Sequence, residues 1–406
     1  MRPSNVCLSF LTLVVCIGLT GCGKIPTWDE LTGKAPPAKT EPEPVAQPAP
    51  TPPPKPPEPS AEEVLAKFKA LKPAELNDSR IQQLLKLNEG LESIYQIDAT
   101  GGMVSSSGLV GIERLPNLKE LDLTGTKIQD DVYSVVAKSQ SIERLTLSRT
   151  EIKGNGIIAL QSLRSLRYLT LTGCKIHEGM WQEIGSLGQI EGLGLDQTDV
   201  TNAAMEFICQ SSSLQRLSIH HTGVTDEGLV YLQHAEKLEV LDLGGLHITG
   251  EGLAFLANSK SGNKGLNSLK FLSLAENKTL TRNGAKLILM LRSLEHLNMS
   301  GVWGVDDVYL TQMFGSLRNL QYIGLSGAGQ PGAITDKGLA GLGNLKNLTT
   351  VFLESINTVS DVTLGNLAKC KELSEVHIDG ACTILGAQKF KKMRPDCLLV
   401  VKGVKY

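Results

Sequence analysis

The stretch Leu214-Gln215-Arg216-Leu217-Ser218-Ile219-His220-His221-Thr222-Gly223-Val224-Thr225-Asp226-Glu227-Gly228-Leu229 contains both halves of a unit that recurs along this chain. Its first half places apolar residues at the first, fourth and sixth positions. Since side chains alternate along a strand, the fourth and sixth positions are predicted to point inward from a short strand. The second half ends in Thr-Asp-Glu-Gly-Leu, which predicts a helix start because Thr and Asp are good N-caps and suit the positive helix end.

The spacing of this unit is regular. Seven copies follow one another every 24 residues, and five later copies, after an insertion around Ser259–Asn267, are spaced by 25 to 28 residues. The copies begin at Ile94, Leu118, Ile142, Leu166, Ile190, Leu214, Leu238, Leu269, Leu294, Leu320, Leu348 and Leu373. A further 24 residues lead to Cys397-Leu398-Leu399-Val400, which predicts a terminal strand. A fixed period in this range indicates stacked repeats that bury their apolar residues against one another.

The positions after the strand are equally regular. The ninth is polar or Cys, and its side chain is predicted to satisfy buried backbone where the strand turns away. Its members are Thr126, Thr150, Cys174, Thr198 and Thr222. Apolar residues such as Leu229 and Leu232 follow the helix-start phrase, so short helices are expected on the side opposite the strands.

Over residues 91–402 the pattern resembles leucine-rich-repeat proteins of the 24-residue T-x-I-T-D-x-G-L type. The resemblance implies an α/β horseshoe solenoid with a concave parallel β-sheet, short convex helices and protein recognition on the concave surface. We expect this domain to span 91–406, with about 12 repeats plus the terminal strand. Residues 60–90, which open with the capping-box pattern Ser60-Ala61-Glu62-Glu63, are predicted to form a helical N-terminal cap.

The N-terminus has the form of a secretory signal. A basic start, Met1-Arg2-Pro3, is followed by an apolar run from Val6 to Leu19, which predicts a signal peptide over 1–21. Leu19-Thr20-Gly21-Cys22 resembles the lipobox of bacterial lipoproteins, which implies that Cys22 carries the lipid. Alternatives are an ordinary cleaved signal and a membrane-spanning anchor, the latter disfavoured by the short run. We expect secretion across the inner membrane and lipid anchoring in the envelope, with the outer membrane or cell surface favoured because no Asp follows Cys22.

A proline-rich segment over 35–59 follows the lipidated N-terminal segment (22–34). Prolines lack N–H donors, so the segment is predicted to be a disordered tether of polyproline II character. At about 3.1 Å per residue it reaches on the order of 75 Å. A ligand for domains with aromatic grooves is the alternative.

Several function classes are excluded by the sequence. The net charge of −2, from 40 Lys+Arg against 42 Asp+Glu, provides no overall basic field for nucleic acid. The chain has no G-x-S-x-G elbow, H-E-x-x-H helix or phosphate loop. We therefore predict a protein that is not an enzyme, needs no cofactor and is a monomer.

Two groups of concave-face residues are candidates for ligand binding, because Tyr and Arg are favoured at interfaces and exposed aromatics mark binding surfaces. The first group is Arg144, Arg149, Tyr168, Arg216, His220 and His221, and the second is Phe271, His296, Tyr322 and Phe352. A solvated face with scattered large residues is the alternative. His220-His221 beside Asp196 do not predict a metal, because neighbouring strand residues point to opposite faces.

The cysteines give a further expectation. Cys174 and Cys209 are predicted to be buried thiols. Cys370, Cys382 and Cys397 gather near the C-terminal end, where a Cys370–Cys397 or Cys382–Cys397 disulfide would staple the last repeat in an oxidising compartment.

Together these features predict a membrane-anchored protein-binding module that presents a leucine-rich-repeat concave surface at the bacterial cell envelope. Binding of a glycan or cell-wall polysaccharide through the exposed aromatics is the alternative. A structural envelope protein without a discrete ligand is a third possibility.

Overall fold

The computed structural model describes residues 59–257 and 266–406. The predicted signal peptide (1–21), Cys22, the lipidated segment (22–34) and all but the last residue of the predicted tether (35–59) lie outside these residues. Within the described ranges, no helix combines the length and apolar character needed to span a bilayer.

The described body begins with two helices, α1 (Ala61–Ala70) and α2 (Asp78–Leu85). The Ser60 hydroxyl accepts a hydrogen bond from the Glu63 N–H at 3.2 Å and so caps α1 as predicted. Ile81, Leu84 and Leu85 of α2 are buried, while α1 has no fully buried residue. These helices cover the apolar end of the first repeat, and the prediction of a helical cap is confirmed.

A single sheet runs through all the repeats. Its strands follow the chain order, and every neighbouring pair from β1 to β13 is parallel. The strands are β1 (Gln96–Asp98), β2 (Glu120–Asp122), β3 (Arg144–Thr146), β4 (Tyr168–Thr170), β5 (Gly192–Gly194), β6 (Arg216–Ser218), β7 (Val240–Asp242), β8 (Phe271–Ser273), β9 (His296–Asn298), β10 (Tyr322–Gly324), β11 (Thr350–Leu353), β12 (Glu375–Ile378), β13 (Leu398–Val401) and β14 (Val404–Lys405). The terminal strand was predicted at β13. The sequence pattern did not indicate β14, which turns back and pairs with β13 antiparallel.

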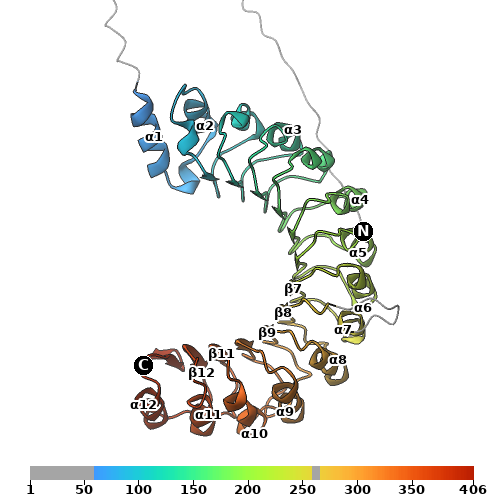
Figure 1. Ribbon diagram of the computed structural model, residues 1–406, viewed down its shortest axis with the longest axis vertical. Helices are drawn as coiled ribbons and strands as arrows, with labels where there is room; N and C mark the ends of the chain where they lie inside the picture. Colours follow the sequence, from blue (N-terminus) through green and yellow to red (C-terminus); the bar gives the residue numbers. More distant parts are fainter. Residues whose placement is uncertain (1–58, 258–265) are drawn as a thin grey trace, which may run out of the picture. The chain divides into compact units, whose positions relative to one another are not determined.

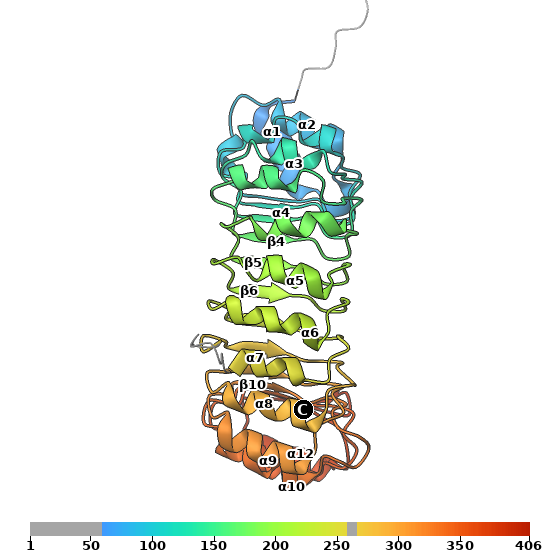
Figure 2. The same cartoon turned by 90° about the vertical axis from the view of Figure 1, so that its right-hand side faces the viewer.

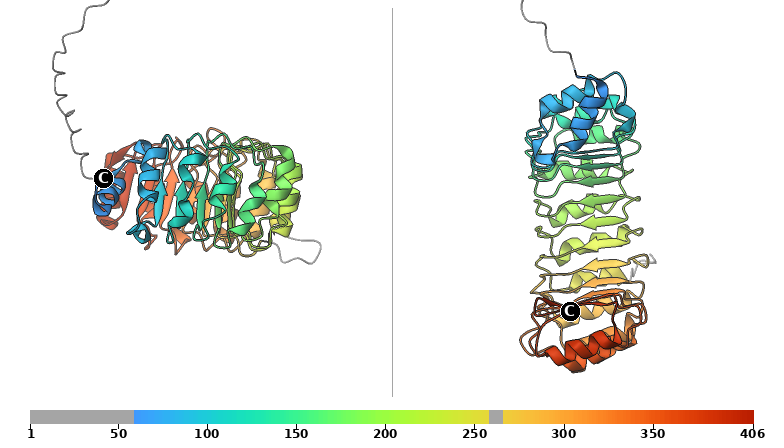
Figure 3. Two further views of the ribbon diagram at one scale, coloured as in Figure 1. Left: turned by 90° about the horizontal axis from the view of Figure 1, so that it is seen from above. Right: turned by 90° about the vertical axis from the view of Figure 1, so that its left-hand side faces the viewer.

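Short helices follow most strands. They are α3 (Val132–Val136), α4 (Trp181–Gly185), α5 (Asn202–Ile208), α6 (Asp226–Leu229), α7 (Ala254–Ala257), α8 (Arg282–Leu287), α9 (Asp307–Ser316), α10 (Asp336–Leu339), α11 (Asp361–Leu367) and α12 (Ile384–Met393). In the remaining repeats, 3-10 turns such as Ser106–Leu109 and Ile157–Ser162 take their place. Helices cover the outer, convex side of the repeat body and strands line its inner, concave side (Figures 1, 2 and 3).

The repeat positions explain the core. In the unit that opens at Leu214, the first, fourth and sixth residues are at most 1% exposed. The ninth residue, Thr222, donates its hydroxyl to the Ile219 carbonyl at 2.8 Å, and Thr126 and Thr198 do the same in their own repeats. The predicted role of the ninth position, satisfying buried backbone at the strand end, is therefore confirmed.

The aspartate of the helix-start phrase has a different role from the one predicted. The Asp226 carboxylate accepts hydrogen bonds from the backbone N–H groups of Thr249, Gly250 and Gly252, all in the next repeat. Asp336 binds the next repeat in the same way, through Ser360 and Thr363. Where it occurs, as at positions 226 and 336, the aspartate thus ties its repeat to the following one, because the stacked turns place that repeat's unpaired N–H groups beside it.

The predicted C-terminal disulfide is wrong. Cys370, Cys382 and Cys397 are free thiols, and all three are buried. The Cys370 thiol donates to the Leu342 carbonyl of the preceding repeat, and that of Cys397 donates to the Leu398 carbonyl. Burial raises the pKa of Cys370 to about 11 and that of Cys382 to about 12, so both thiols stay protonated and unreactive.

Candidate binding surface

The third and fifth positions of each repeat face the concave side, because the fourth and sixth are buried in the core. Large side chains at these positions gather in two regions of the sheet. One region lies on β3–β6 and the other on β8–β12.

The second region is a continuous ladder of stacked rings. The ring centroids of Phe271 and His296 are 6.0 Å apart, those of His296 and Tyr322 5.9 Å, and those of Tyr322 and Phe352 5.7 Å. His377 of β12 extends the ladder, with its ring centroid 4.4 Å from that of Phe352. All five side chains are half-buried. We call these residues (Phe271, His296, Tyr322, Phe352 and His377) the aromatic ladder.

The ladder changes position between β10 and β11. Tyr322 lies opposite Thr350, whereas Phe352 lies opposite Gly324, two residues further along the strand. Gly324 has no side chain, so the Phe352 ring can lean toward Tyr322 across this gap. Phe352 and His377 are direct register partners. Sequence reasoning missed His377, although a signal was present: like Phe352, it occupies the fifth position of its repeat.

Acidic side chains flank the C-terminal end of the ladder. His377 Nε2 lies 2.9 Å from Glu375 Oε1, and His377 Nδ1 lies 3.5 Å from Glu354 Oε1. Burial, and secondly the negative charge of Glu375, raise the pKa of the Tyr322 phenol. The phenol is therefore neutral at physiological pH and available as a hydrogen-bond donor near the Glu375 carboxylate.

Part of the first predicted group also forms a row. Arg144, Tyr168, Gly192 and Arg216 are successive register partners on β3–β6. The Arg144 guanidinium lies over the Tyr168 ring, 4.2 Å from its centroid. A Cβ at Gly192 would lie only 3.0 Å from Tyr168 Cε1, so the glycine provides the space beside the ring. This row is a cation–π pair with a second arginine two strands away.

Arg149 does not belong to this row. It occupies the eighth position of its repeat, where the backbone has already left the sheet with φ +54°. It lines a separate hollow of about 770 Å³ together with residues such as Gln129, Glu151 and Lys175. The structure thus separates Arg149 from Arg144 and Tyr168, with which it was grouped from the sequence.

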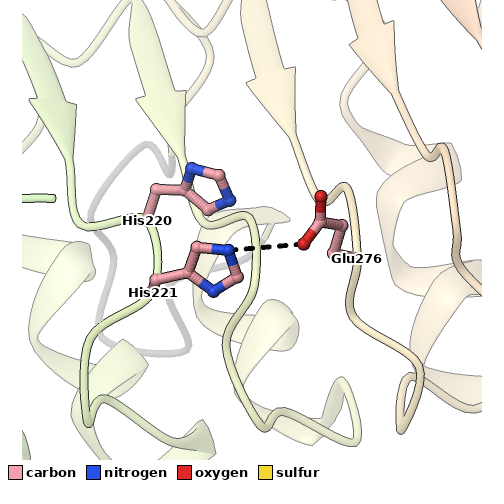
Figure 4. Close-up of side chains that lie close together, drawn as sticks. All are labelled: His220, His221 and Glu276. Atoms are coloured by element: carbon pink, nitrogen blue, oxygen red, sulfur yellow. Dashed lines mark ion pairs between the residues drawn. The ribbon is translucent and has the colours of Figure 1, made fainter. Parts of the chain in front are cut away.

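His220 and His221 lie on the same side of the chain, and the expectation that they point to opposite faces is wrong. Their rings are stacked with centroids 4.2 Å apart and an interplanar angle of 17° (Figure 4). The cause is the left-handed backbone of His221, with φ +54°, which breaks the strand alternation. Asp196 does not join the pair of rings: its carboxylate accepts from the His220 N–H at 2.9 Å and from the Ser218 hydroxyl.

The family model for the leucine-rich repeat matches residues 114–131 and 210–232. Among solved structures, an internalin from Listeria monocytogenes is 18% identical with a TM-score of 0.50, covering 85% of this chain and 95% of that chain. A leucine-rich-repeat protein from Leptospira interrogans is 18% identical with a TM-score of 0.43, covering 82% and 98%. No curated protein matches the sequence. The family match and the internalin fold agree with the parallel sheet and its convex helices. The described chain is therefore a leucine-rich-repeat solenoid, a fold consistent with a protein-binding module.

Proposed function

We propose that this protein is a protein-binding module held at the bacterial cell envelope by lipid on Cys22, with the concave sheet as its binding face. The observation that carries this proposal is the aromatic ladder on β8–β12. Five half-buried rings on five neighbouring strands span on the order of 20 Å, since strands lie about 4.8 Å apart. Such a length suits a helix or an extended segment of a partner protein.

The chemistry around the ladder specifies the partner further. Its rings offer apolar contact, while Glu354 and Glu375 at its C-terminal end add negative charge. We therefore propose a partner segment with apolar side chains flanked by Lys or Arg. The row formed by Arg144 and Tyr168 on β3 and β4 is a second contact region for the same partner, with the opposite charge.

A protein partner is favoured over a glycan by the way the rings are arranged. Sugars bind aromatic side chains by lying flat on an open ring face. In the ladder, His296, Tyr322 and Phe352 each have a ring on both sides, so their faces are directed at one another. Their edges are left for the ligand, which suits mixed side-chain contacts better than a sugar ring.

Removing the centre of the ladder is expected to abolish partner capture. The experiment is chemical cross-linking in the bacterium that produces the full chain, followed by capture of this protein and identification of what is bound. The Tyr322→Ala/Phe352→Ala double variant loses the partner, because hot-spot aromatics contribute about 2 kcal/mol or more each to such interfaces. The matched control is Val308→Ala/Val362→Ala, which removes two exposed apolar side chains from convex helices α9 and α11.

Both outcomes of this comparison are informative, provided that the two variants unfold at the same temperature as the wild type. Loss of the captured partner in the ladder variant, with the partner retained in the control variant, supports the proposal. Capture of the same proteins by both variants, or retention of polysaccharide that only the ladder variant loses, contradicts a protein site at this place.

Anchoring is tested separately. Cells grown with a labelled fatty acid are expected to incorporate the label into the wild-type chain and not into Cys22→Ser, because the acyl chains attach to the Cys22 sulfur. More than one acyl chain is needed for stable anchoring, so the variant leaves the membrane fraction. Equal labelling of both chains, or a membrane-bound Cys22→Ser chain, would argue against the lipid on Cys22.

A further inference from the structure

The eighth position of the repeat has the same unusual backbone throughout. Its residue has a positive φ in all twelve repeats, and in seven of them it is glycine. The others are Arg149, Gln197, His221, Glu276 and Ser355. The left-handed conformation costs a non-glycine residue about 1 kcal/mol or more, and side chains that persist in such positions often have a function.

Two of these residues, His221 and Glu276, are brought together across a gap. His220 and His221 follow strand β6, and Glu276 follows β8, while Gly244 and Gly245 occupy the matching positions of the repeat between them. The His221 N–H donates to the Gly244 carbonyl at 3.0 Å and the Gly245 N–H to the Ala275 carbonyl at 2.7 Å. These bonds hold the three repeats in register beyond the ends of the strands.

The two glycines make room for the imidazoles. A Cβ at Gly244 would lie 2.8 Å from His220 Cδ2, and a Cβ at Gly245 would lie 2.8 Å from His221 Cγ. Both distances are too short for a real side chain. The His220 and His221 rings therefore lie over the middle repeat, in the direction of Glu276 (Figure 4).

Side-chain nitrogen atoms of the two histidines and a carboxylate oxygen of Glu276 lie close together over this middle repeat. His221 Nε2 lies 3.3 Å from Glu276 Oε2, and one ligand atom from each of the three residues lies within 4.8 Å of the other two. His220 Nε2 is inaccessible to solvent and has no hydrogen-bond partner among the described residues. An unpaired buried nitrogen is costly, so the pocket is incomplete without a further group.

We propose that His220, His221 and Glu276 form a binding site for a divalent transition-metal ion, with Zn²⁺ as the best fit. Zinc binds imidazole nitrogen and carboxylate oxygen at about 2.0–2.2 Å, so two tetrahedral ligands lie about 3.4 Å apart. The separation between His221 and Glu276 is close to this value. The lone pairs of two stacked rings cannot both point at one ion, so the exposed His221 ring has to rotate out of the stack to complete the site with His220 and Glu276.

A plain ion pair explains less of the arrangement. An exposed His–Glu pair contributes little to stability, and it leaves the buried nitrogen of His220 without a partner. A metal ion would provide a partner for that nitrogen and would also be bound by His221 and Glu276. Asp196, which accepts from the His220 N–H, and Asp242, which accepts from the Gly244 N–H at 2.9 Å, act as positioning residues for the site.

Three protein ligands leave a fourth position of the ion open to solvent. The site lies after β6–β8, between the Arg144–Tyr168 row and the aromatic ladder. The inference is independent of the proposed function, because it concerns this chain alone.

The test is calorimetric titration of the chelator-treated full chain with Zn²⁺. We expect one ion per chain, with affinity at least 100-fold lower in His221→Ala and about tenfold lower in Glu276→Gln, since loss of a ligand is costly in a three-ligand site. Gly244→Ala, which retains every ligand but displaces His220, is expected to weaken binding as well. His234→Ala is the matched control: it removes an exposed histidine from the convex 3-10 turn Val230–His234 and leaves zinc affinity unchanged.

Unchanged zinc binding in His221→Ala, or loss of it in His234→Ala, overturns the proposal. Co²⁺ provides a second readout, because thiolate ligands add a sulfur-to-metal charge-transfer absorption that nitrogen and oxygen ligands lack. Appearance of that absorption places the ion on cysteine and also overturns the proposal.

The variant His221→Gly distinguishes loss of a metal ligand from a folding defect, because glycine adopts the left-handed backbone at this position without strain. This variant is expected to unfold at a temperature no lower than that of the wild type without zinc, and to show no zinc-dependent increase. A zinc-dependent increase equal to that of the wild type contradicts the site.

Discussion

Gly338→Ala is expected to destabilise the repeat body by about 3 kcal/mol, because the new Cβ meets backbone as well as the Asp307 carboxylate, which a hydrogen bond from Thr335 holds in place. That atom would lie 2.7 Å from the Cα of Asp307 in the preceding repeat. Gly228 and Gly252 have the same relation to Asn202 and Asp226, at 3.1 Å and 3.0 Å from their Cα atoms. The glycine of the helix-start phrase is thus required where one helix passes close to the previous one.

The measurement is urea unfolding at pH 7, with Gly365→Ala as the control. Gly365 also lies in a convex helix, α11, but a Cβ there has no neighbouring atom within 4 Å. Alanine at this position is expected to stabilise the protein by about 0.5–1 kcal/mol, which is the usual helix preference over glycine. Equal effects of the two substitutions would show that the close approach at Gly338 is not what requires glycine.

The pattern of unfolding is a second readout for Gly338→Ala. Repeat proteins are stabilised by contacts between neighbouring repeats. Weakening one such contact is expected to separate the unfolding of the repeats before α10 from that of the repeats after it. Hydrogen exchange should therefore become faster in α10 and α11 and stay unchanged at β2 and β3.

Asp336→Ala is the second substitution with a large expected effect. The Asp336 carboxylate accepts four hydrogen bonds, from the backbone N–H and the hydroxyl of Ser360 and of Thr363, at 2.5 to 3.2 Å. Ser360 caps α11, so these bonds also satisfy the N-terminus of that helix. Their loss is expected to cost about 3 kcal/mol, because hydrogen bonds to a charged group are stronger than neutral ones.

The pH dependence follows from the direction of the pKa shift. Burial raises the pKa of Asp336, but the four hydrogen bonds outweigh it and the net effect is a pKa below the usual value. A lowered folded-state pKa stabilises the protein at pH values above the unfolded-state pKa, near 4. That contribution is lost as the pH falls below 4 through the folded-state pKa, when the carboxylate becomes protonated.

Urea unfolding at pH 7 and pH 3 is the measurement for this prediction. The difference in free energy of unfolding between the wild type and Asp336→Ala should be larger at pH 7 than at pH 3. Asp396→Ala, which removes an exposed carboxylate, serves as the control and should change stability by no more than about 0.5 kcal/mol. A gap that is the same at both pH values would mean that the ionised form of Asp336 is not what stabilises the contact.

Much of the architecture is determined by the sequence alone. The 24-residue period defines the strand of each repeat, because only residues at the first, fourth and sixth positions are apolar in every copy. The polar ninth position follows from the need to satisfy backbone groups that a buried turn leaves unpaired. The stacking of Phe271, His296 and Tyr322 can also be predicted from the sequence, since a parallel sheet in register aligns equal repeat positions.

Only the tertiary structure decided how residues of different repeats meet. The contact between the Tyr322 and Phe352 rings joins a third-position to a fifth-position residue, where Gly324 leaves space, and so links Phe352 and His377 to the rest of the ladder. The hydrogen bonds of Asp336 to the next repeat depend on where that repeat places its N–H groups, which the sequence of a single repeat does not determine. The same holds for Cys370 and Cys397, whose thiols find carbonyl partners instead of each other.

The pair His220 and His221 shows most clearly what could not be predicted from the sequence. Strand alternation places neighbouring side chains on opposite faces, and the histidine at position 221 does not itself indicate a departure, although glycine occupies the same position in seven of the twelve repeats. The left-handed backbone there is imposed by the stack, since its N–H must reach the Gly244 carbonyl of the next repeat. The sequence determined the repeat because local periodicity defines its core, whereas the contacts across repeats were decided by the geometry of stacking.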